Sequence, residues 1–399
     1  MKKRWVAAVL AGMITGAVLL SGCGGRSSAA DSAGQEAAGS DQQAGQEAEN
    51  TGAAGTEAVS ETASESVSAQ VSAGEMETLK VGMLGQDMKT ACVIMAKELG
   101  LFEEEGVDVQ FEKVSNLAEG ITAVSEGKLD VLPYGAIPTL SFASQGADVC
   151  VFGGTISEGS ECVTLPENAD LYKEAEDFRG KIIGCFRMET GHMVMKGYLR
   201  EHGLEPDVDV QYVYLDSQAS IAEAVKKGEV DLGFVNSGFG YVAEGNGLKV
   251  AFHAGDFVEG FPCCRQSTSG KTLAEKKDAL VKFEIAALRA YEIYLNDHAK
   301  TIELLSAYSG QDAAYTEAVM YGTDTYRNAM TVSLNPNKKK VLDFYETMKL
   351  NGDIDANTPV DMADHIDTTV YETALQTLAD READNTLWQD LMQEEKETN

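Results

Sequence analysis

The stretch that decides the fold is AVSEGKLDVLPYGAIP, residues 123–138. Its pattern predicts the end of a helix, a glycine stop, a short buried strand and a Gly/Pro turn that opens the next helix. A near-copy, AVKKGEVDLGFVNSG, occupies residues 224–238. The shared pattern Ala-Val-x-x-Gly-x-(Leu/Val)-Asp therefore begins at Ala123 and again at Ala224, 101 residues later.

A second echo keeps the same offset. The tripeptide Val-Asp-Val at 107–109 recurs at 208–210, and a Gly-Leu pair lies shortly before each copy. Repetition at this length predicts two similar α/β lobes rather than a solenoid, with coincidence as the alternative. Two lobes enclose a cleft, and clefts of this kind commonly hold small-molecule ligands.

The chain begins with a targeting pattern. Three basic residues at positions 2–4 precede an uncharged apolar run at 5–20, and Leu-Ser-Gly-Cys follows, ending at Cys23. This ending resembles the bacterial lipobox, and the resemblance implies cleavage before Cys23 and lipid attachment to its thiol. A lipid holds a protein to a membrane without spanning it. We expect residues 1–22 to be a lipoprotein signal peptide; an ordinary secretory signal and an uncleaved anchor helix are the alternatives.

Residues 23–78 are predicted to form a disordered acidic linker. The segment contains no aromatic residue and no proline, and no basic residue stands between Arg26 and Lys80. Such a composition cannot bury enough apolar surface to offset chain entropy, and its like charges favour extension. The linker would either tether a folded domain above a membrane or serve as a spacer with no selected sequence.

The remaining part, about 320 residues, is long enough for a large core. The net charge of −32 argues against binding to nucleic acids or other polyanions. The six cysteines beyond Cys23 show no metal-ligand spacing, and most lie in apolar strand patterns, so we expect core residues, although some could pair in an exported protein. A bond between Cys263 and Cys264 would be strained, because neighbouring strand residues point to opposite faces.

Strand and helix patterns alternate through both copies, which predicts βαβ units and parallel sheets. The first copy is predicted to contain strands at 79–84, 107–114, 129–132 and 147–156 and helices at 90–99, 117–126 and 137–144. The second is predicted to contain strands at 182–186, 208–215, 230–235, 248–252 and 261–266 and helices at 193–201, 221–227 and just after Gly238. The tail is predicted to be helical and to brace the first lobe, with helices at 273–295, 301–308, 313–322, 338–349 and 370–377.

Several landmarks carry a resemblance to a known family. They are GLFEEEGVDV at 100–109, EGKLD at 126–130, FRGK at 178–181 and GEVD at 228–231. In this order they resemble substrate-binding proteins of ABC importers, in the branch that binds sulfonates, taurine, nitrate and thiamine-pyrimidine precursors. The resemblance implies an α/β, two-lobed periplasmic-binding-protein-like fold of type II. Each lobe would be a mostly parallel sheet flanked by helices, with a C-terminal helical extension.

The resemblance also implies the domain organisation and the function. Lobe I would comprise 79–158 and 266–399, and lobe II 159–265. The protein would be an extracytoplasmic, lipid-anchored monomer that captures a small organic molecule or oxyanion and delivers it to ABC permease subunits. A ligand-sensing lipoprotein and a pyrimidine-synthesis-type enzyme on the same fold are the alternatives. The sequence shows no Ser-His-Asp pattern, P-loop or zinc signature, so we expect no enzyme activity, cofactor or metal.

In open α/β sheets, ligands lie beyond the carboxyl ends of the strands, where helix N-termini offer free N–H groups that suit anions. Glycine and asparagine are also common in turns for turning alone. Four strand-to-helix turns qualify, and the predicted ligand-binding residues in them are Gln86, Asp87, Tyr134, Gly135, Ala136, Thr190, Gly191, His192, Asn236 and Ser237.

The charged residues near these turns favour two different kinds of solute. Arg187 and Arg265 are candidate clamps for an anion, because a guanidinium matches an oxyanion in a bidentate fork; surface ion pairs are the alternative. Asp87 and Glu189 would repel an anion and favour a neutral or amine-bearing solute. His192 could donate to an anion or be solvated, and Tyr134 and Phe239 could stack on a ligand or simply pack.

Overall fold

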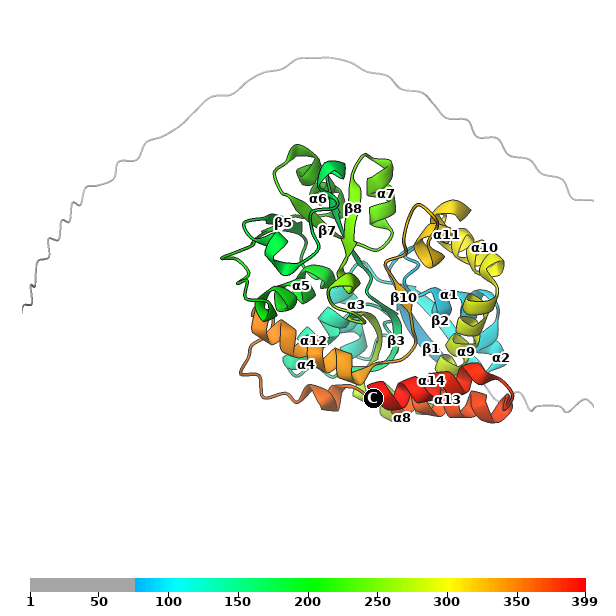
Figure 1. Ribbon diagram of the computed structural model, residues 1–399. Coiled ribbons are helices and arrows are strands. Elements are labelled where there is room, and N and C mark those ends of the chain that lie inside the picture. Colours follow the sequence, from blue (N-terminus) through cyan, green and yellow to red (C-terminus); the bar gives the residue numbers. More distant parts are fainter. Residues whose placement is uncertain (1–75) are drawn as a thin grey trace, which may run out of the picture. The chain divides into compact units, whose positions relative to one another are not determined.

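The computed structural model describes residues 76–399 (Figure 1). The predicted signal peptide, Cys23 and nearly all of the predicted linker lie outside the described residues. Within residues 76–399, no helix is both long enough and apolar enough to cross a membrane. The first strand begins at Glu77, two residues earlier than the sequence pattern indicates.

Lobe I denotes here the sheet around β1 (Glu77–Met83) and the helices packed on it. β1 pairs in parallel with β2 (Val107–Lys113). On its other side, isolated bridges join Val81 to Val131 in parallel and Leu132 to Ser267 in antiparallel. The next strands are β9 (Pro262–Thr268), β3 (Cys150–Ser157) and β10 (Thr331–Val332), all antiparallel to their neighbours. The helices of this part are α1 (Ala91–Glu98), α2 (Leu101–Glu104), α3 (Leu117–Ser125) and α4 (Ala136–Ser144).

Lobe II denotes the five-stranded sheet of order β6-β5-β7-β4-β8 and its helices. Its strands are β4 (Ser160–Thr164), β5 (Ile182–Cys185), β6 (Gln211–Tyr214), β7 (Leu232–Asn236) and β8 (Lys249–His253). β4 runs antiparallel to β7 and β8, whereas β5 is parallel to β6 and β7. The helices are α5 (Thr190–Glu201), α6 (Gln218–Lys227) and α7 (Phe239–Gly245). Short 3₁₀ turns lie at Pro166–Asn168, Ala175–Phe178, Ala254–Asp256 and Met362–His365.

The two sheets share one strand order. With the strands of each lobe counted along the chain, the second strand lies at the edge of the sheet, followed by the first and the third. An antiparallel strand that comes from the other lobe, here called the crossing strand, lies next, and the fourth strand follows it. The crossing strand of lobe I is β9 and that of lobe II is β4. Because β4 follows β3 directly and β9 follows β8, the chain passes between the lobes twice.

The repeated aspartate occupies the same position in both lobes. The Asp130 carboxylate accepts a hydrogen bond from the backbone N–H of Lys80 in β1, at 2.8 Å. The Asp231 carboxylate accepts one from the backbone N–H of Ile182 in β5, also at 2.8 Å. The sequence repeat is therefore a structural repeat, in which each aspartate fixes the third strand of a lobe against its first strand.

A threonine of each crossing strand completes the repeat. The Thr268 hydroxyl of β9 donates to the carbonyl of Asp130 at 2.7 Å, and the Thr164 hydroxyl of β4 donates to the carbonyl of Asp231 at 2.8 Å. Each aspartate thus ties three strands together through its side chain and its backbone. The sequence repeat does not include these threonines. Thr268 lies in a strand that follows the third strand of lobe I along the chain, whereas Thr164 lies in a strand that precedes the first strand of lobe II.

The C-terminal tail is helical, as predicted, but it does more than brace lobe I. Its helices are α8 (Gly270–Glu275), α9 (Lys277–Asn296), α10 (His298–Ser309), α11 (Ala313–Tyr321), α12 (Lys338–Asn351), α13 (Thr369–Arg381) and α14 (Thr386–Thr398). α9 packs on α1, α2 and α13 within lobe I. α12 packs instead on α5 of lobe II, and α11 touches α7 (Figure 1).

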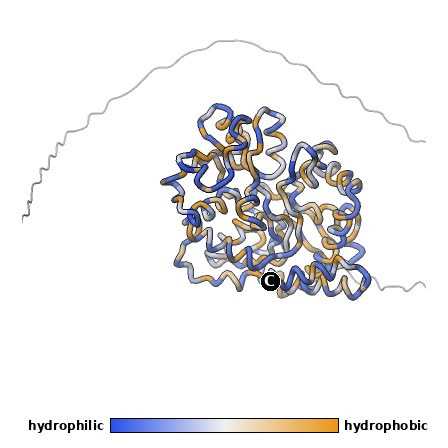
Figure 2. The backbone as a smooth tube through the Cα atoms, viewed as in Figure 1, coloured by the Kyte–Doolittle hydropathy of each residue, from blue (hydrophilic) through white to orange (hydrophobic). Residues whose placement is uncertain are grey.

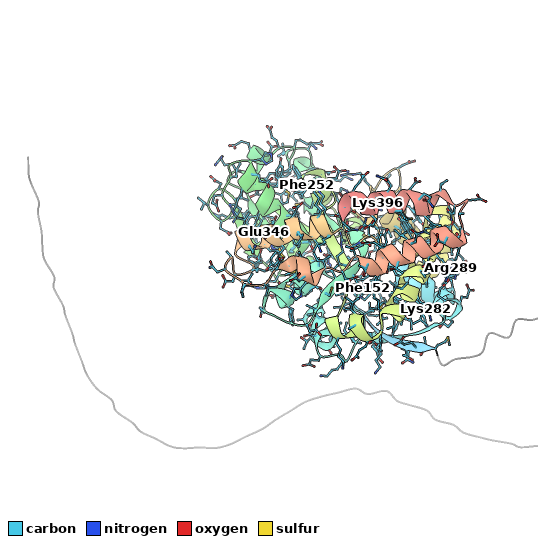
Figure 3. All side chains as sticks on the ribbon, turned by 90° about the horizontal axis from the view of Figure 1, so that it is seen from below. Phe152, Phe252, Lys282, Arg289, Glu346 and Lys396 are labelled. Atoms are coloured by element: carbon cyan, nitrogen blue, oxygen red, sulfur yellow. The ribbon has the colours of Figure 1, made fainter. Side chains whose placement is uncertain are left out.

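Each lobe has its own aromatic centre. In lobe I, the ring of Phe283 stacks on Phe102 at 4.9 Å and meets Phe152 edge-on. In lobe II, the ring of Phe252 meets Phe178 and Phe257 edge-on. Phe152 and Phe252 are labelled in Figure 3, in separate parts of the molecule. Figure 2 shows hydrophobic and hydrophilic residues alternating along the helices, as expected of helices that cover a sheet on one side.

Several elements differ from the prediction; α2 and β10 are two that were not predicted. β4 was not predicted as a strand, because SECVT is short and lacks an apolar alternation. The predicted strand at 129–132 pairs only through the two isolated bridges at Val131 and Leu132. α5 begins at Thr190, three residues before the predicted start, and α14 was not predicted at all.

We predict that removing either repeated aspartate destabilises the fold. Asp130→Ala and Asp231→Ala each leave a strand N–H without its carboxylate acceptor, and a hydrogen bond to a charged group contributes about 1.5–3 kcal/mol. The free energy of unfolding, measured with urea, should fall by about that amount in each variant. Asp216→Ala, at an exposed position of lobe II, is the matched control and should change it little. Wild-type stability in both aspartate variants would contradict the structural role.

Candidate functional site

A cavity of about 290 Å³ lies where the two lobes and the C-terminal tail meet. The β1–α1 turn of lobe I contributes one wall, and the β7–α7 turn of lobe II contributes the opposite wall. Side chains near α11 and before β10 close a third side. The lining residues are Gln86, Asp87, Met88, Lys89, Gln218, Asn236, Ser237, Phe239, Val242, Gln311, Tyr315, Val319 and Met330.

The structure brings together the predicted residues of two turns and leaves the other two turns outside the lining. Gln86 and Asp87 face the cavity from lobe I, and Asn236 and Ser237 face it from lobe II. Phe239, considered for stacking, also lines it. The six remaining predicted residues are not part of the lining: Tyr134, Gly135, Ala136, Thr190, Gly191 and His192.

The lobe I wall carries a carboxylate and an ammonium. The backbone N–H of Lys89 donates to the Asp87 carboxylate at 2.7 Å, which fixes the turn before α1. Burial by itself lowers the pKa of Lys89, but the nearby Asp87, Cys263, Cys264 and Glu189 outweigh it and raise this pKa. Lys89 therefore keeps its proton, and its charge is balanced from within the protein.

The lobe II wall offers uncharged polar groups. The side-chain oxygen of Gln218 accepts from the backbone N–H of Asn236 at 2.7 Å and so fixes the turn after β7. The Ser237 Oγ atom is buried and has no hydrogen-bond partner among the described residues. A buried hydroxyl without a partner costs free energy, so a solute that bonds to Ser237 would recover it.

The turn of Tyr134 belongs to the core of lobe I. The Tyr134 side chain is 2% exposed, and its hydroxyl lies 3.4 Å from that of Thr90. Burial raises the pKa of this phenol. A Cβ atom on Gly135, which has a φ of +53°, would lie 3.0 Å from Leu117 and Pro138, so the position needs glycine for packing. The stacking role considered for Tyr134 is therefore not available in this conformation.

The turn of His192 is also internal. His192 is 1% exposed, and its Nδ1 atom lies 3.0 Å from the Glu189 carboxylate, so it is neither solvated nor open to an anion. The same carboxylate accepts from the backbone N–H groups of Gly191 and His192, and from the Ser160 hydroxyl. Glu189 is thus the N-cap of α5, which begins at Thr190. The sequence pattern predicts that this helix begins at Met193, with Thr190, Gly191 and His192 in a turn before it, whereas these three residues form its first turn.

Glu189 does not line the cavity, although its charge is near enough to act on Lys89. Burial alone raises the pKa of its carboxyl, but the hydrogen bonds from His192 and Ser160 and the charge of His192 outweigh burial and lower this pKa. The carboxylate charge is used inside lobe II to hold the first turn of α5. Gly191 fits there because a Cβ atom would collide with the Ser160 side chain.

Neither arginine considered as an anion clamp lines the cavity. Arg265 is 1% exposed and donates to the backbone carbonyls of Pro336, Ile156 and Cys264 at 2.8–2.9 Å. Burial lowers the pKa of Arg265 to about 10. Arg187 is exposed, and its guanidinium lies over the ring of Tyr214 at 5.2 Å. Among the described lining residues, Lys89 is the cationic side chain.

The tail joins lobe II through a buried carboxyl group that no sequence pattern singled out. Glu161 on β4 is fully buried, accepts from the backbone N–H of Gly240 at 2.8 Å and is bonded to the Tyr326 hydroxyl. Burial raises the pKa of Glu161 to about 7. Nearby, the Arg327 guanidinium donates to both carboxylate oxygens of Asp256. The segment between α11 and β10 is thus fixed to lobe II beside the cavity.

Comparison with known proteins decides the family. Residues 87–300, more than half of the chain, match the family described as NMT1/THI5 like. The chain belongs to the NMT1/THI5-like family. This confirms the family-level resemblance, since that branch was expected from the landmarks between residues 100 and 231.

A curated relative of this family member is an enzyme by its name. A stretch of 142 residues is 28% identical to the 4-amino-5-hydroxymethyl-2-methylpyrimidine phosphate synthase of Schizosaccharomyces pombe. The match covers 35% of this chain and 39% of the yeast protein, so this chain spans less than half of that relative.

Solved structures of transport proteins share the fold. The ligand-binding component of an ABC-type import system from Staphylococcus aureus aligns with a TM-score of 0.60 at 16% identity, over 75% of this chain and 99% of that chain. The periplasmic nitrate-binding protein NrtA from Synechocystis aligns with a TM-score of 0.62 at 15% identity, over 76% and 89%. These likenesses confirm the two-lobed periplasmic-binding-protein-like fold.

We predict that Glu161 makes stability depend on pH. An unfolded glutamate has a pKa near 4.3, so the folded chain holds this proton more tightly between about pH 4.3 and 7. The contribution of Glu161 is fully present below that window and is lost as the pH rises through about 7. Urea unfolding between pH 4 and 8 should show this decline in the wild type and a flatter profile in Glu161→Gln. The exposed control Glu98→Gln should keep the wild-type slope; the same slope in Glu161→Gln would assign it to other groups.

Proposed function

We propose that this protein is a lipid-anchored solute-binding protein of an ABC importer, extracytoplasmic and monomeric. The observation that carries the proposal is the cavity between lobes, with Gln86 and Asp87 on one wall and Asn236 and Ser237 on the other. A solute that contacts both walls favours the closed arrangement over the open one. The shared fold with ligand-binding components of import systems supports this reading.

The anchor and the lobe boundaries complete the proposal. Lipid on Cys23 would hold the protein to the membrane, and the segment 23–78 would let the folded part reach the permease. Its root-mean-square reach as a random coil is about 40 Å. The lobes would divide at 79–158 and 266–399 against 159–265, near the two passages of the chain between the sheets.

The chemistry of the lining favours a polar nitrogen heterocycle over an oxyanion. Asp87 can accept from an amine, the ring of Phe239 can stack on a planar molecule, and the lining offers several carboxamides as donors and acceptors. No guanidinium is present among the described lining residues to grip nitrate or a sulfonate. We therefore propose an aminopyrimidine of the kind named in the curated relatives.

The cavity size agrees with this class of solute. A volume of about 290 Å³ is at the small end for ligand sites, which commonly span 300–1,000 Å³. A single substituted ring fits that space, whereas a dinucleotide or a coenzyme does not. The Asn236 carboxamide in the lining would then bond to a ring nitrogen or an exocyclic oxygen of the solute.

An enzyme that makes a pyrimidine is the second candidate, because the curated relatives carry that name. A reactive group would have to face the cavity. His192 does not, since it is buried and bonded to Glu189. Lys89 does face the cavity, but its raised pKa keeps it protonated and removes it as a base near neutral pH. We therefore place binding before catalysis, with ligand sensing as a further alternative.

We predict that 4-amino-5-hydroxymethyl-2-methylpyrimidine binds more tightly than taurine or nitrate, measured by calorimetry on the full chain. Asp87→Asn and Asn236→Ala should each weaken its binding about tenfold or more, which corresponds to about 1.4 kcal/mol per decade. Glu98→Gln, an exposed position of α1, removes a charge without touching the cavity and should bind like the wild type. Tighter binding of an oxyanion, or wild-type affinity in both cavity variants, would refute the proposed site.

Mass spectrometry of the bound compound separates binding from catalysis. If the protein is a binder, incubation of the ligand-free protein with a deproteinised cell extract should not increase the total amount of this pyrimidine or of its phosphate. An increase in either compound that exceeds one equivalent per protein chain would establish turnover and favour the enzyme instead.

A further inference from the structure

The crossing strand β9 carries two adjacent cysteines whose sulfur atoms lie close together. Strand geometry predicts that Cys263 and Cys264 point to opposite faces, yet their Sγ atoms are 3.9 Å apart. The register explains this: Ile156 of β3 pairs with Cys264 and Ser157 pairs with Pro262, which leaves Cys263 as an extra residue. A β-bulge at Cys263 therefore turns both thiols toward the same side.

This dithiol lies beside the cavity wall. A Cβ atom placed on Gly159 would lie 2.9 Å from the Cys263 sulfur and 3.4 Å from the Ser237 hydroxyl, so these two groups border the same small space. Ser237 lines the cavity, and the ammonium of Lys89 on the opposite wall is close enough to interact with both thiols. The two thiols are 6% and 5% exposed and lie behind this wall rather than in the cavity lining.

The surroundings favour the thiolate of Cys263. The hydrogen bond with Cys264, the charge of Lys89 and a hydrogen bond with Thr190 lower the pKa of Cys263, although burial and Glu189 oppose them. The thiolate is the nucleophilic form of cysteine. Burial instead raises the pKa of Cys150 and of Cys185 to about 12. Of these thiols, Cys263 is the one prepared to react.

We propose that Cys263 and Cys264 form a reversible redox site at the cavity, oxidised by low-molecular-weight disulfides that enter it. The Cys263 thiolate attacks one sulfur of the disulfide RSSR, forms a mixed disulfide and releases RS⁻. The Cys264 thiol then loses its proton and attacks the Cys263 sulfur, which closes the protein disulfide and releases the second RS⁻. The two thiols lose two protons and two electrons, and RSSR becomes 2 RSH once the protons are taken up.

Closure of the disulfide changes the cavity wall. The two sulfur atoms must approach from 3.9 Å to about 2.05 Å, and the thiolate that faces Lys89 disappears. A disulfide between neighbours departs from the preferred Cα separation, so it stores strain and is readily reduced. The site is therefore reversible, and this inference does not depend on which solute the cavity binds.

Peptide mapping of the full chain tests the proposal directly. Cleavage after Lys249 and Arg265 releases VAFHAGDFVEGFPCCR, residues 250–265, which contains both cysteines and no other. After incubation with bis(2-hydroxyethyl) disulfide, which is small enough for the cavity, this peptide should lack two hydrogen atoms and carry no hydroxyethylthio group, and dithiothreitol should restore it. A peptide that keeps its mass, or that keeps a hydroxyethylthio adduct, would overturn the proposal.

Single variants test the order of attack. Cys264→Ser cannot close the ring and should accumulate a hydroxyethylthio adduct on Cys263, whereas Cys263→Ser should leave this peptide unmodified. Cys150→Ser is the matched control, since Cys150 and Cys263 are both 6% exposed, and it should oxidise like the wild type. An adduct that forms first on Cys264 in the Cys263→Ser protein would contradict the assignment. If a variant does not fold, the wild-type peptide map alone decides.

Discussion

One hydrogen bond, made twice, fixes the positions of the cavity walls. The carboxylates of Asp130 and Asp231 hold the third strand of each lobe against the N–H groups of Lys80 and Ile182. The same two residues receive a threonine hydroxyl from the antiparallel crossing strands. Along the chain, β4 follows the strands of lobe I but pairs in the sheet of lobe II, and β9 follows the strands of lobe II but pairs in the sheet of lobe I. The chain therefore passes between the lobes twice. The turns that follow β1 and β7 begin at the carboxyl ends of these strands, and they form the two walls of the cavity.

The sequence was sufficient for this framework, because the repeat AVxxGx(L/V)D is contiguous and its aspartate contacts the first strand of its lobe at nearly the same sequence separation in both copies, from Asp130 to Lys80 and from Asp231 to Ile182. It was insufficient for the details of the turns. Gln86, Asp87, Asn236 and Ser237 line the cavity, but a pattern of small and polar residues does not say which face of a turn is covered. Tyr134 points into the core, and the turn at His192 is closed by the Glu189 cap, which depends on Ser160 from β4. Lys89 could have been selected, since it follows Asp87 by two residues.

The contribution of the tail could not be read from the sequence for a different reason. Tyr315 and Met330 reach the cavity from elements that follow the repeated region and have no counterpart within it. Tyr326 is bonded to Glu161 of β4, and α12 packs so closely on α5 that a Cβ atom on Gly197 would lie 2.9 Å from Thr347. Any movement of lobe II relative to lobe I must therefore carry these tail segments with it or break their contacts with Glu161 and α5. The tail is part of the cleft rather than a support behind it.

The two cysteines lie where the same topology connects the two lobes. β9 is the crossing strand of lobe I and also the connection that leaves lobe II, so a displacement at Cys263 is felt by both lobes at once. Its neighbours come from three places: Lys89 from the β1–α1 turn, Thr190 from the first turn of α5, and Ser237 from the wall after β7. The bulge at Cys263 interrupts the alternation of side chains along β9, so both sulfur atoms point to the same side. Oxidation there would alter the charge that Lys89 faces and the geometry of the passage between lobes.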